Sequence, residues 1–430
     1  MNKKLKKKSN IRLITQIILF IVVLLITINH TLAEKGGGFS FIPSASLHAI
    51  CPFGGVESIY RFITVGSLLQ KIHESSFVLM FIGLVVAAFF GAVFCGWLCP
   101  FGSIQEWIGK IGRKLLGRKY NSFIPYKYDK YLRYLRYLAL AWVIYITAVT
   151  GKLAFSDIDP YSALFHLWTD EVALGGIIIL IIVLIDSLFI ERPWCKYLCP
   201  YGAILGITNK FRIFKIRRHE NTCISCNACN KSCPMNINVA SSSIIKEHQC
   251  IACMKCTSEE SCPVKNTVEF KINKKFMALT LIVLFFGGIE VSKSLDLWQT
   301  ESSKVPVAFK EGAFKGEFNP ADIRGSYSFS NVSQSFDIPL NALVEAFVVD
   351  EKEAQTFKNK DLETKYANLP NEIGTGSVRL FVALYKGLPY DLNEDTYLLE
   401  PAVKILKEKG SLTEEQIKYI DNHVVNLVTK

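Results

Sequence analysis

Charged residues are scarce in this chain of 430 amino acids. Asp, Glu, Lys and Arg make up 20% of it, while hydrophobic residues make up 50%. Soluble proteins usually carry about 25% charged residues, so the composition argues against an ordinary soluble domain. The charges are also separated, because residues 293–430 hold 16 basic and 21 acidic side chains whereas residues 1–292 hold 33 and 17. The net charge of +11 is therefore confined to one part of the chain, and we expect no nucleic-acid partner.

The C-terminal segment, residues 293–430, lacks the residues that most chemistry needs. It has no cysteine, a single histidine (His423), no Gly-rich phosphate loop and no nucleophile–base pair. Its apolar residues recur mostly at helical spacing. The segment is therefore predicted to be a mainly helical docking domain without catalytic residues or metal ligands.

Five long apolar runs indicate a membrane protein. A helix needs about 20 predominantly apolar residues to cross a bilayer, with a lower limit near 17. The third run reaches this length only if Tyr134 and Leu153 are included. We predict an α-helical membrane protein with about five transmembrane helices, and a cleaved signal peptide ending at Ala33 is the alternative for the first of them. The runs are residues 13–29, 77–94, 137–150, 172–190 and 276–292.

The basic residues predict the orientation of these helices. The first twelve residues contain six Lys or Arg and no acid, and the loop 110–136 is strongly basic. The loop 152–171 is instead acidic. Basic loops stay on the cytoplasmic side of a membrane, where they also contact anionic lipid. We therefore expect a multi-pass protein of a bacterial-type cytoplasmic membrane, with the N-terminus and residues 191–275 in the cytoplasm and residues 293–430 outside.

Eight of the thirteen cysteines fall in two adjacent motifs. The first is "CISCNACNKSCP", residues 223–234, and the second is "CIACMKCTSEESCP", residues 250–263. In two-cluster ferredoxins three cysteines of one motif and the last cysteine of the other bind each [4Fe–4S] cluster. Zinc is the rival, but zinc sites usually present cysteines in pairs. The predicted ligands are Cys223, Cys226, Cys229 and Cys262 for cluster I, and Cys250, Cys253, Cys256 and Cys233 for cluster II.

A second repeated motif precedes these cysteines. "FCGWLCPFG", residues 94–102, and "PWCKYLCPYG", residues 193–202, each contain C-x3-C-P followed by an aromatic residue and glycine. Both follow an apolar run, and residues i and i+4 share one face of a helix. Three interpretations are open: a further metal or cluster, a pair of reversible disulfides, or packing residues beside prolines that end helices. The residues concerned are Cys95, Cys99, Cys195 and Cys199.

These motifs together resemble the membrane polyferredoxins of the NapH/NosR/CcoG type. The resemblance covers roughly residues 77–265 and rests on the two C-x3-C-P motifs, on "RPWCKYLCPYG" and on the double ferredoxin motif. It implies a redox role for the C-x3-C-P cysteines. From the apolar runs, the charges and the motifs we predict four parts: a four-helix membrane region (1–207), a two-cluster ferredoxin domain (208–275), a fifth transmembrane helix (276–292) and the outer domain (293–430).

Several other residues are weaker candidates. Cys51 lies in "HAICPFGGVES" and either lines a site at the outer membrane face or is a small buried apolar residue. Asp186 and Glu290 lie in predicted membrane helices, where carboxylates often have a function. Four histidines are expected on the outer side, without a clear pair for haem: His30, His48, His73 and His166.

The sequence predicts an iron–sulfur electron-transfer protein in a membrane. Electrons would pass between a cytoplasmic partner and a membrane quinone or an extracytoplasmic acceptor, with further redox proteins as partners on both sides. The chain would then be a subunit of a quinol or quinone oxidoreductase. The alternatives are a redox- or metal-sensing membrane regulator, a respiratory assembly factor, and a metal reductase acting on copper. Cluster potentials span about −700 to +450 mV, so the direction of flow stays open.

Overall fold

The computed structural model describes most of the chain and divides it into two compact units. Unit 1 is Met1–Ser302 and unit 2 is Ser303–Lys430. Each is considered by itself. The described residues are 11–34, 37–39, 41–43, 45–65, 73–150, 153, 155–169, 172–298, 300, 304–309, 312–390, 392, 395–409 and 412–426.

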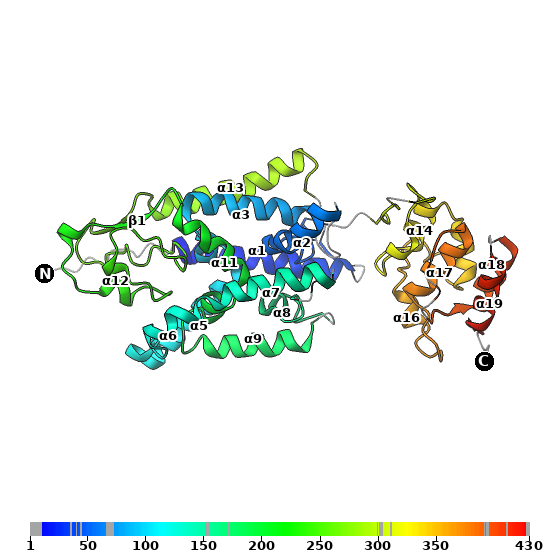
Figure 1. Cartoon of the computed structure of the whole chain (residues 1–430), viewed down its shortest axis with the longest axis horizontal. Helices are drawn as coiled ribbons and strands as arrows, with labels where there is room; N and C mark the ends of the chain where they lie inside the picture. Colours follow the sequence, from blue (N-terminus) through cyan, green and yellow to red (C-terminus); the bar gives the residue numbers. More distant parts are fainter. Residues whose placement is uncertain are drawn as a thin grey trace. The chain divides into compact units, whose positions relative to one another are not determined.

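Five apolar helices form the frame of unit 1. They run roughly parallel in the view of Figure 1, and α13 contacts both α1 and α3. Each helix occupies one of the five apolar runs. They are α1 (Ile11–Glu34), α3 (Glu74–Phe90), α7 (Leu135–Thr150), α9 (Leu174–Asp186) and α13 (Lys274–Ser294).

Three of these helices are long enough to cross a membrane. The stretches Ile11–Ala33, Tyr126–Val149 and Lys274–Ser294 meet the requirement of length and composition among the described residues. The second includes α6 (Tyr126–Leu132), which continues into α7. Helices α3 and α9 have only 17 and 13 residues, and 13 residues span about 20 Å. The molecule is thus a mostly helical membrane protein, and its count of five crossings stays a prediction.

The five helices alternate in direction. Contacts place the start of α1, of α7 and of α13 at the end of unit 1 that carries the paired cysteines. Arg12 donates to Gly96 O at 2.9 Å and Arg136 donates to His248 O at 2.8 Å, while Met277 packs in one cluster with Trp97. The ends of α3 and α9 lead into the two C-x3-C-P motifs at this same end. An alternating bundle of this kind is compatible with five crossings.

Each C-x3-C-P motif lies on two short helices instead of one continuous helix. The first motif spans α4 (Val93–Trp97) and α5 (Pro100–Leu116), and the second spans α10 (Pro193–Tyr197) and α11 (Pro200–Ile207). Helix α3 ends at Phe90 because Gly91 takes a positive φ of 79°. The two cysteines of each motif therefore do not share one face of a continuous helix, as their i, i+4 spacing suggested, although all of them line one cavity. The residue before a proline avoids the helical region, so each proline begins a helix that the preceding cysteine caps.

Two further helices fill the frame between the long ones. Helix α2 (Pro52–Val65) packs against α3 and α7, and α8 (Pro160–Phe165) packs against α9. The contact of α2 with α3 is close at Gly55, where a Cβ atom would lie 2.9 Å from Ser76 O. A larger residue there would force the two helices apart.

The two ferredoxin motifs form a small module at the cysteine-rich end of unit 1. Two three-residue strands, β1 (Ile216–Arg218) and β2 (Val268–Phe270), pair antiparallel and hold its two ends together. Between them lie α12 (Ala228–Lys231) and single turns of 3-10 helix, η3 (Glu220–Thr222) and η4 (Val239–Ser241). The turn η2 (Thr208–Lys210) joins the module to α11. Its buried core is formed by Met235, Ile237, Val239 and Ile245.

Unit 2 is a helical domain with its own hydrophobic core. Helix α17 (Thr375–Lys386) is central, because Val378, Leu380, Phe381 and Val382 are fully buried. A short parallel pair, β3 (Leu398–Leu399) with β4 (Val424–Val425), closes the last part of the chain. The other elements are η5 (Pro320–Asp322), α14 (Phe329–Phe336), α15 (Leu340–Ala346), α16 (Asp361–Lys365), α18 (Glu400–Lys409) and α19 (Glu414–Asn422).

Candidate metal centres

Eight ferredoxin cysteines surround two separate cavities. One cavity, of about 340 Å³, is lined by Cys233, Cys250, Cys253 and Cys256. The other, of about 310 Å³, is lined by Cys223, Cys226, Cys229 and Cys262. Each cavity thus combines three cysteines of one motif with the last cysteine of the other, which is the exchange that the spacing predicts. Their role as ligands of cluster II and cluster I stays a prediction.

The backbone around both cavities is suited to a negatively charged group. Ser225 and Asn227 in the first motif have φ angles of 53° and 54°, and Ala252 and Met254 occupy the same places in the second motif with 45° and 53°. Left-handed residues of this kind are costly outside glycine. Alternating right- and left-handed residues turn successive N–H groups toward one point, and such nests hold iron–sulfur clusters. The donor set and the loops therefore fit a [4Fe–4S] cluster in each cavity.

Burial disfavours the thiolate form of these cysteines unless a metal binds the sulfur. Burial raises the pKa of Cys233 to about 12, with the neighbouring Cys253 adding to the effect. A metal ion displaces the thiol proton on binding. Among the described residues no three His, Cys, Asp or Glu side chains lie close enough together to hold a single metal ion.

The four C-x3-C-P cysteines surround a third cavity, which we call the four-cysteine cavity. It has a volume of about 420 Å³, and Cys95, Cys99, Cys195 and Cys199 all line it. The structure contains no disulfide among the described cysteines. The two motifs meet through α5 and α10. Gln105 Nε2 lies 3.5 Å from Cys195 Sγ, and Gln105 Oε1 accepts a hydrogen bond from Trp194 N at 3.2 Å. The sequence could not specify this contact.

The two motifs have the same local structure. Cys99 Sγ accepts a hydrogen bond from Gly102 N at 3.4 Å, and Cys199 Sγ accepts one from Gly202 N at 3.3 Å. Both cysteines are N-caps with proline at the first helical position, where the missing N–H has no cost. The repeated sequence therefore forms a repeated turn that aims one sulfur at the start of a helix. The aromatic residue and the glycine that follow each proline complete this turn.

The four-cysteine cavity shares a wall with the cluster II cavity. Ile251 lines both. Gly96 packs directly on this residue, because a Cβ atom at Gly96 would lie 2.2 Å from Ile251 O. The buried Trp97 donates a hydrogen bond from Nε1 to Ala252 O at 3.1 Å. Gly96 thus allows the first motif to approach Ile251 closely. The second motif has Lys196 at the matching position.

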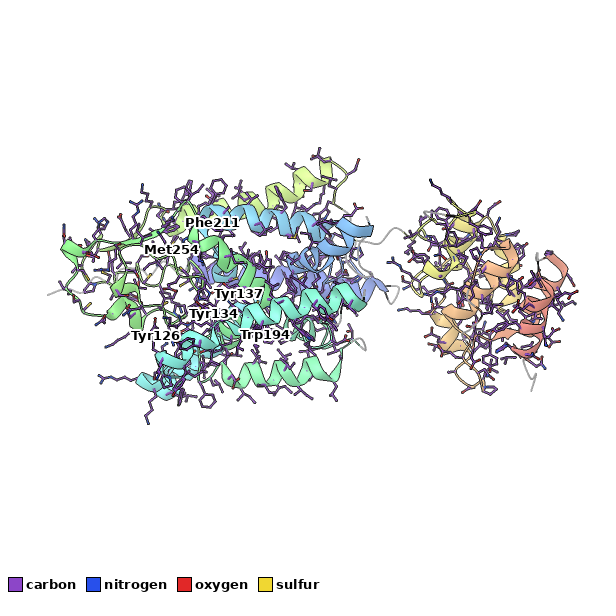
Figure 2. The ribbon with its side chains drawn as sticks, viewed as in Figure 1. Tyr126, Tyr134, Tyr137, Trp194, Phe211 and Met254 are labelled. Carbon is purple, nitrogen blue, oxygen red and sulfur yellow. The ribbon has the colours of Figure 1, made fainter. Side chains whose placement is uncertain are left out.

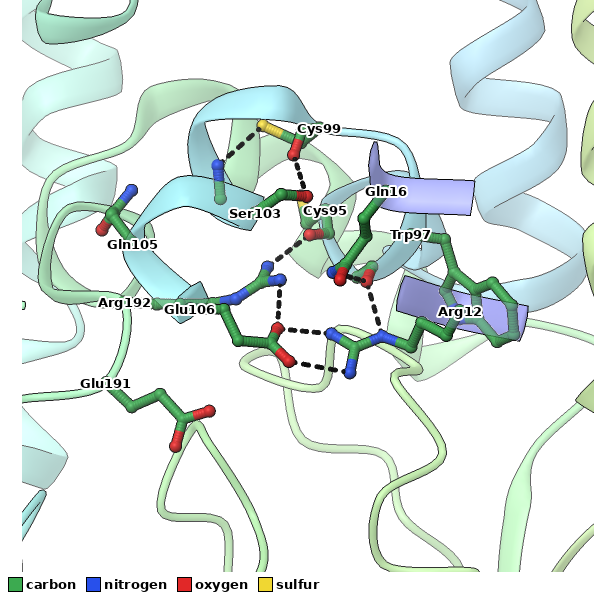
Figure 3. Close-up of polar contacts among 12 residues, drawn as sticks. Arg12, Gln16, Cys95, Trp97, Cys99, Ser103, Gln105, Glu106, Glu191 and Arg192 are labelled. Carbon is green, nitrogen blue, oxygen red and sulfur yellow. Dashed lines mark hydrogen bonds and ion pairs between the residues drawn. The ribbon is translucent and has the colours of Figure 1, made fainter. Parts of the chain in front are cut away.

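A buried carboxylate, Glu106 of α5, connects α1 with the segment before α10 (Figure 3). Arg12 donates to both its oxygens at 3.0 and 2.5 Å, and Arg192 donates to Oε2 at 2.6 Å. Arg192 is fully buried and also donates to Cys95 O. Burial opposes the charge of Glu106, but Arg12, Arg192 and Lys255 hold the pKa of Glu106 well below its ordinary value. Glu106 is therefore ionised at neutral pH.

Lys255 connects the ferredoxin module to the same network. It lies between Cys253 and Cys256, and its Nζ is 2.6 Å from Glu191 Oε1 and 3.2 Å from Glu106 Oε1. Sequence reasoning missed Glu106, Glu191 and Lys255. One signal was present, because Glu106 is the single acid in α5. An isolated acid in a basic segment often has a buried partner, but which partner depends on the fold.

Replacing Glu106 with glutamine should destabilise unit 1. The change leaves Arg192 buried without its counter-charge, and breaking a buried ion pair from one side costs about 3–5 kcal/mol. We expect a lower midpoint in thermal unfolding of the purified chain in detergent. The matched control is Glu290→Gln, because the side chain of Glu290 is 69% exposed and pairs with the neighbouring Lys293, which is also exposed. Equal midpoints for Glu106→Gln and the wild type would show that the network is unimportant for stability.

The weaker candidates fall at several places. Cys51 packs against the apolar core that contains Cys95, so it is partly buried beside the candidate centre. Glu290 is exposed, and Asp186 is the last residue of α9. The rings of His48 and His166 stack with centroids 6.1 Å apart, a pairing that the sequence did not reveal. His30 and His73 lie at the end of α1 and just before α3.

Comparison with known proteins identifies the motifs around the four-cysteine cavity. Residues 72–119 and 172–219 each match a family described as "4Fe-4S binding domain". These two ranges contain the C-x3-C-P motifs and end before Cys223. No solved structure matches the chain.

Several curated proteins are similar to part of this chain. YccM of Escherichia coli (strain K12) is 33% identical over 267 residues, which are 58% of this chain and 73% of YccM. The ferredoxin-type protein NapH of Haemophilus influenzae is 28% identical over 45% of this chain and 69% of its own. The regulatory protein NosR of Stutzerimonas stutzeri is 28% identical over 40% of this chain and 24% of its own. The chain therefore belongs to the membrane-bound ferredoxin-type family that includes YccM, NapH and NosR, and it carries two copies of a [4Fe–4S] binding domain.

Proposed function

We propose that the protein passes electrons between a cytoplasmic partner and a membrane quinone or an extracytoplasmic acceptor. The route runs through cluster I, cluster II and a further redox centre held by Cys95, Cys99, Cys195 and Cys199. The observation that carries the proposal is the shared wall at Ile251, since one residue separates the cluster II cavity from the four-cysteine cavity. A [4Fe–4S] cluster supplies one-electron chemistry, and reducing a quinone takes two electrons and two protons.

The exposure of the cysteines supports an order for this route. Cys226 and the neighbouring Ile224 are exposed beside the cluster I cavity, and Ile224 is 63% exposed. Cys250 and Cys256 of the cluster II cavity are buried. A soluble redox protein would therefore meet cluster I first. The cluster II cavity is lined by Ile251 and Ala252, which contact Gly96 and Trp97, so a cluster held there would be the step nearest the membrane.

The alternating helices support the orientation that the charges predict. With the N-terminus in the cytoplasm, the ferredoxin module lies on the cytoplasmic side and unit 2 lies outside after α13. Unit 2 has a complete core of its own and no cysteine. We propose that it is an extracytoplasmic docking domain for a redox partner.

A second candidate function is regulation by redox or metal state. The similarity to the regulatory protein NosR favours it, although this chain covers only 24% of that protein. In that case the clusters would report the state of an electron pool without carrying a steady flow. The same four-cysteine cavity would then serve as the sensor. An assembly factor belongs to this second class, whereas a metal reductase acting on copper is a third alternative in which electrons do flow.

Electron exchange with a quinone pool distinguishes the two. The full chain, purified without oxygen, is placed in liposomes containing a naphthoquinone with an isoprenoid tail. A reduced small ferredoxin is then added outside, and the quinone is followed by its ultraviolet absorption. We expect quinone reduction, or the reverse flow from quinol to oxidised ferredoxin, only when the protein is present. Intact clusters that exchange no electrons with the quinone in either direction would refute the quinone as partner and leave an extracytoplasmic acceptor or regulation.

A further inference from the structure

An open pocket lies beside the four-cysteine cavity. It has a volume of about 1380 Å³ and is formed where α7, α11 and the ferredoxin module meet. His248 lines both this pocket and the four-cysteine cavity. A molecule in the pocket would be separated from the four cysteines by this one imidazole. The pocket is lined by Tyr134, Tyr137, Ile207, Lys210, Ser242, Ile244, Lys246, Glu247 and His248.

Aromatic rings form one side of the pocket. The ring of Tyr134 stacks on His248 with centroids 5.1 Å apart and an interplanar angle of 28°. The ring centroid of Tyr137 lies 5.6 Å from that of the same imidazole. Figure 2 shows Tyr134, just before α7, close to Tyr137 on α7. Aromatic side chains in such offset stacks favour flat, aromatic ligands.

His248 has one hydrogen-bond donor available to a ligand. Arg136 Nη2 lies 2.8 Å from Nδ1 of His248. A guanidinium only donates, so Nδ1 must accept, and the imidazole proton of a neutral His248 lies on Nε2. No described residue accepts a hydrogen bond from Nε2. The ligand should therefore offer an acceptor such as a carbonyl oxygen.

The pocket continues onto a face of α7 that is open and apolar. Leu138 and Tyr145 are each 67% exposed, and Trp142 is 46% exposed. With Tyr134 they recur at helical spacing within the candidate membrane span Tyr126–Val149. Ile207 at the rim of the pocket is 45% exposed. A long apolar tail could follow this face into the bilayer while the ring occupies the pocket.

We propose that this pocket binds the head group of a membrane quinone, with Tyr134 against its ring and His248 Nε2 donating to a carbonyl. The proposal rests on the function above and assigns its quinone a position. A quinone combines the flat ring, the carbonyl acceptor and the apolar tail that the pocket and α7 favour. The head group of an anionic lipid is the competing occupant, but Glu247 partly offsets the positive charges of Lys210 and Lys246, and a phosphate has no ring to stack.

Binding to the full chain in lipid nanodiscs tests the position. The probe is a naphthoquinone with two isoprene units, titrated by calorimetry after iron and sulfide have been counted. Loss of the stack in Tyr134→Leu should raise Kd about three- to tenfold. Loss of the donor in His248→Phe should raise it to a similar extent, by up to about tenfold.

Two matched variants keep the test specific. Tyr134→Phe retains the ring and should bind within about twofold of the wild type. Tyr128→Leu removes an exposed aromatic residue of α6 that lines neither the pocket nor the apolar face of α7, and it should bind like the wild type. Iron and sulfide contents equal to those of the wild type separate a loss of the pocket from a loss of the clusters.

Every result of this experiment either supports or overturns the proposed quinone position. Weaker quinone binding in Tyr134→Leu and His248→Phe, with both controls unchanged, supports it. Unchanged binding in these two variants overturns the position, while electron exchange in liposomes still upholds the function. A wild-type chain that binds no quinone also overturns the position. Variants that lose affinity only for nanodiscs rich in phosphatidylglycerol would show a lipid site, which likewise refutes it.

Discussion

Replacing Cys233 with alanine should remove about four of the eight irons that two [4Fe–4S] clusters contribute, and the loss should come from the cluster of the other motif. Cys233 belongs by sequence to the first motif, yet it lines the cavity of Cys250, Cys253 and Cys256. Alanine offers no ligand in its place. Chemical analysis of iron and acid-labile sulfide in anaerobically purified protein measures the loss.

Double variants show which cysteines share a cluster. Cys233→Ala combined with Cys253→Ala should lose no more iron than either change alone, because residues that act as a unit are non-additive. Cys233→Ala combined with Cys226→Ala should lose the iron of both clusters. The opposite pattern, in which Cys233 and Cys226 are non-additive, would mean that each motif binds its own cluster. A preparation rich in zinc, without the broad visible absorption of iron–sulfur clusters, would contradict both clusters.

Serine at any of Cys95, Cys99, Cys195 and Cys199 should abolish electron exchange with the membrane while the ferredoxin clusters remain. All four sulfurs line one cavity of about 420 Å³, so losing one should disable the site. The quadruple variant should be no worse than each single variant. Liposome assays measure the exchange, and electron paramagnetic resonance of the reduced protein reports the ferredoxin clusters.

Cys51→Ser is the matched control for these changes. Cys51 is a partly buried cysteine of the same apolar core, but it does not line the four-cysteine cavity. Its replacement should leave electron exchange close to that of the wild type. If the quadruple variant exchanges electrons normally, the C-x3-C-P cysteines are packing residues and the repeat is only structural.

Much of the iron–sulfur chemistry follows from the sequence because its signals are local. The spacing of the cysteines from Cys223 to Cys262 depends on short loops, and a loop of a few residues has few ways to present three sulfurs. The five apolar runs likewise indicate helices, since a long apolar stretch is stable in a membrane only when its backbone bonds to itself. These features need no knowledge of distant contacts. The family resemblance rests on the same short motifs.

The lengths of the helices were less predictable from the sequence. The run 172–190 reads as one helix by hydropathy, yet α9 ends at Asp186 and Arg192 takes a left-handed conformation. That conformation is held by bonds from Arg192 to Cys95 O and to Glu106, residues more than 80 positions away. A local pattern contains no information on such partners.

The sequence by itself determined the helices, the cysteine motifs and the class of chemistry, because each depends on residues close together in the chain. Only the tertiary structure decided that the two C-x3-C-P turns enclose one cavity, that Ile251 separates it from the cluster II cavity, and that His248 faces the pocket on α7. The physical reason is that these neighbours are selected by packing. Gly96 must lack a side chain because it contacts Ile251 directly. Glu106 can be buried because three cations surround it. Both conditions arise only when α1, α5 and the ferredoxin module come together.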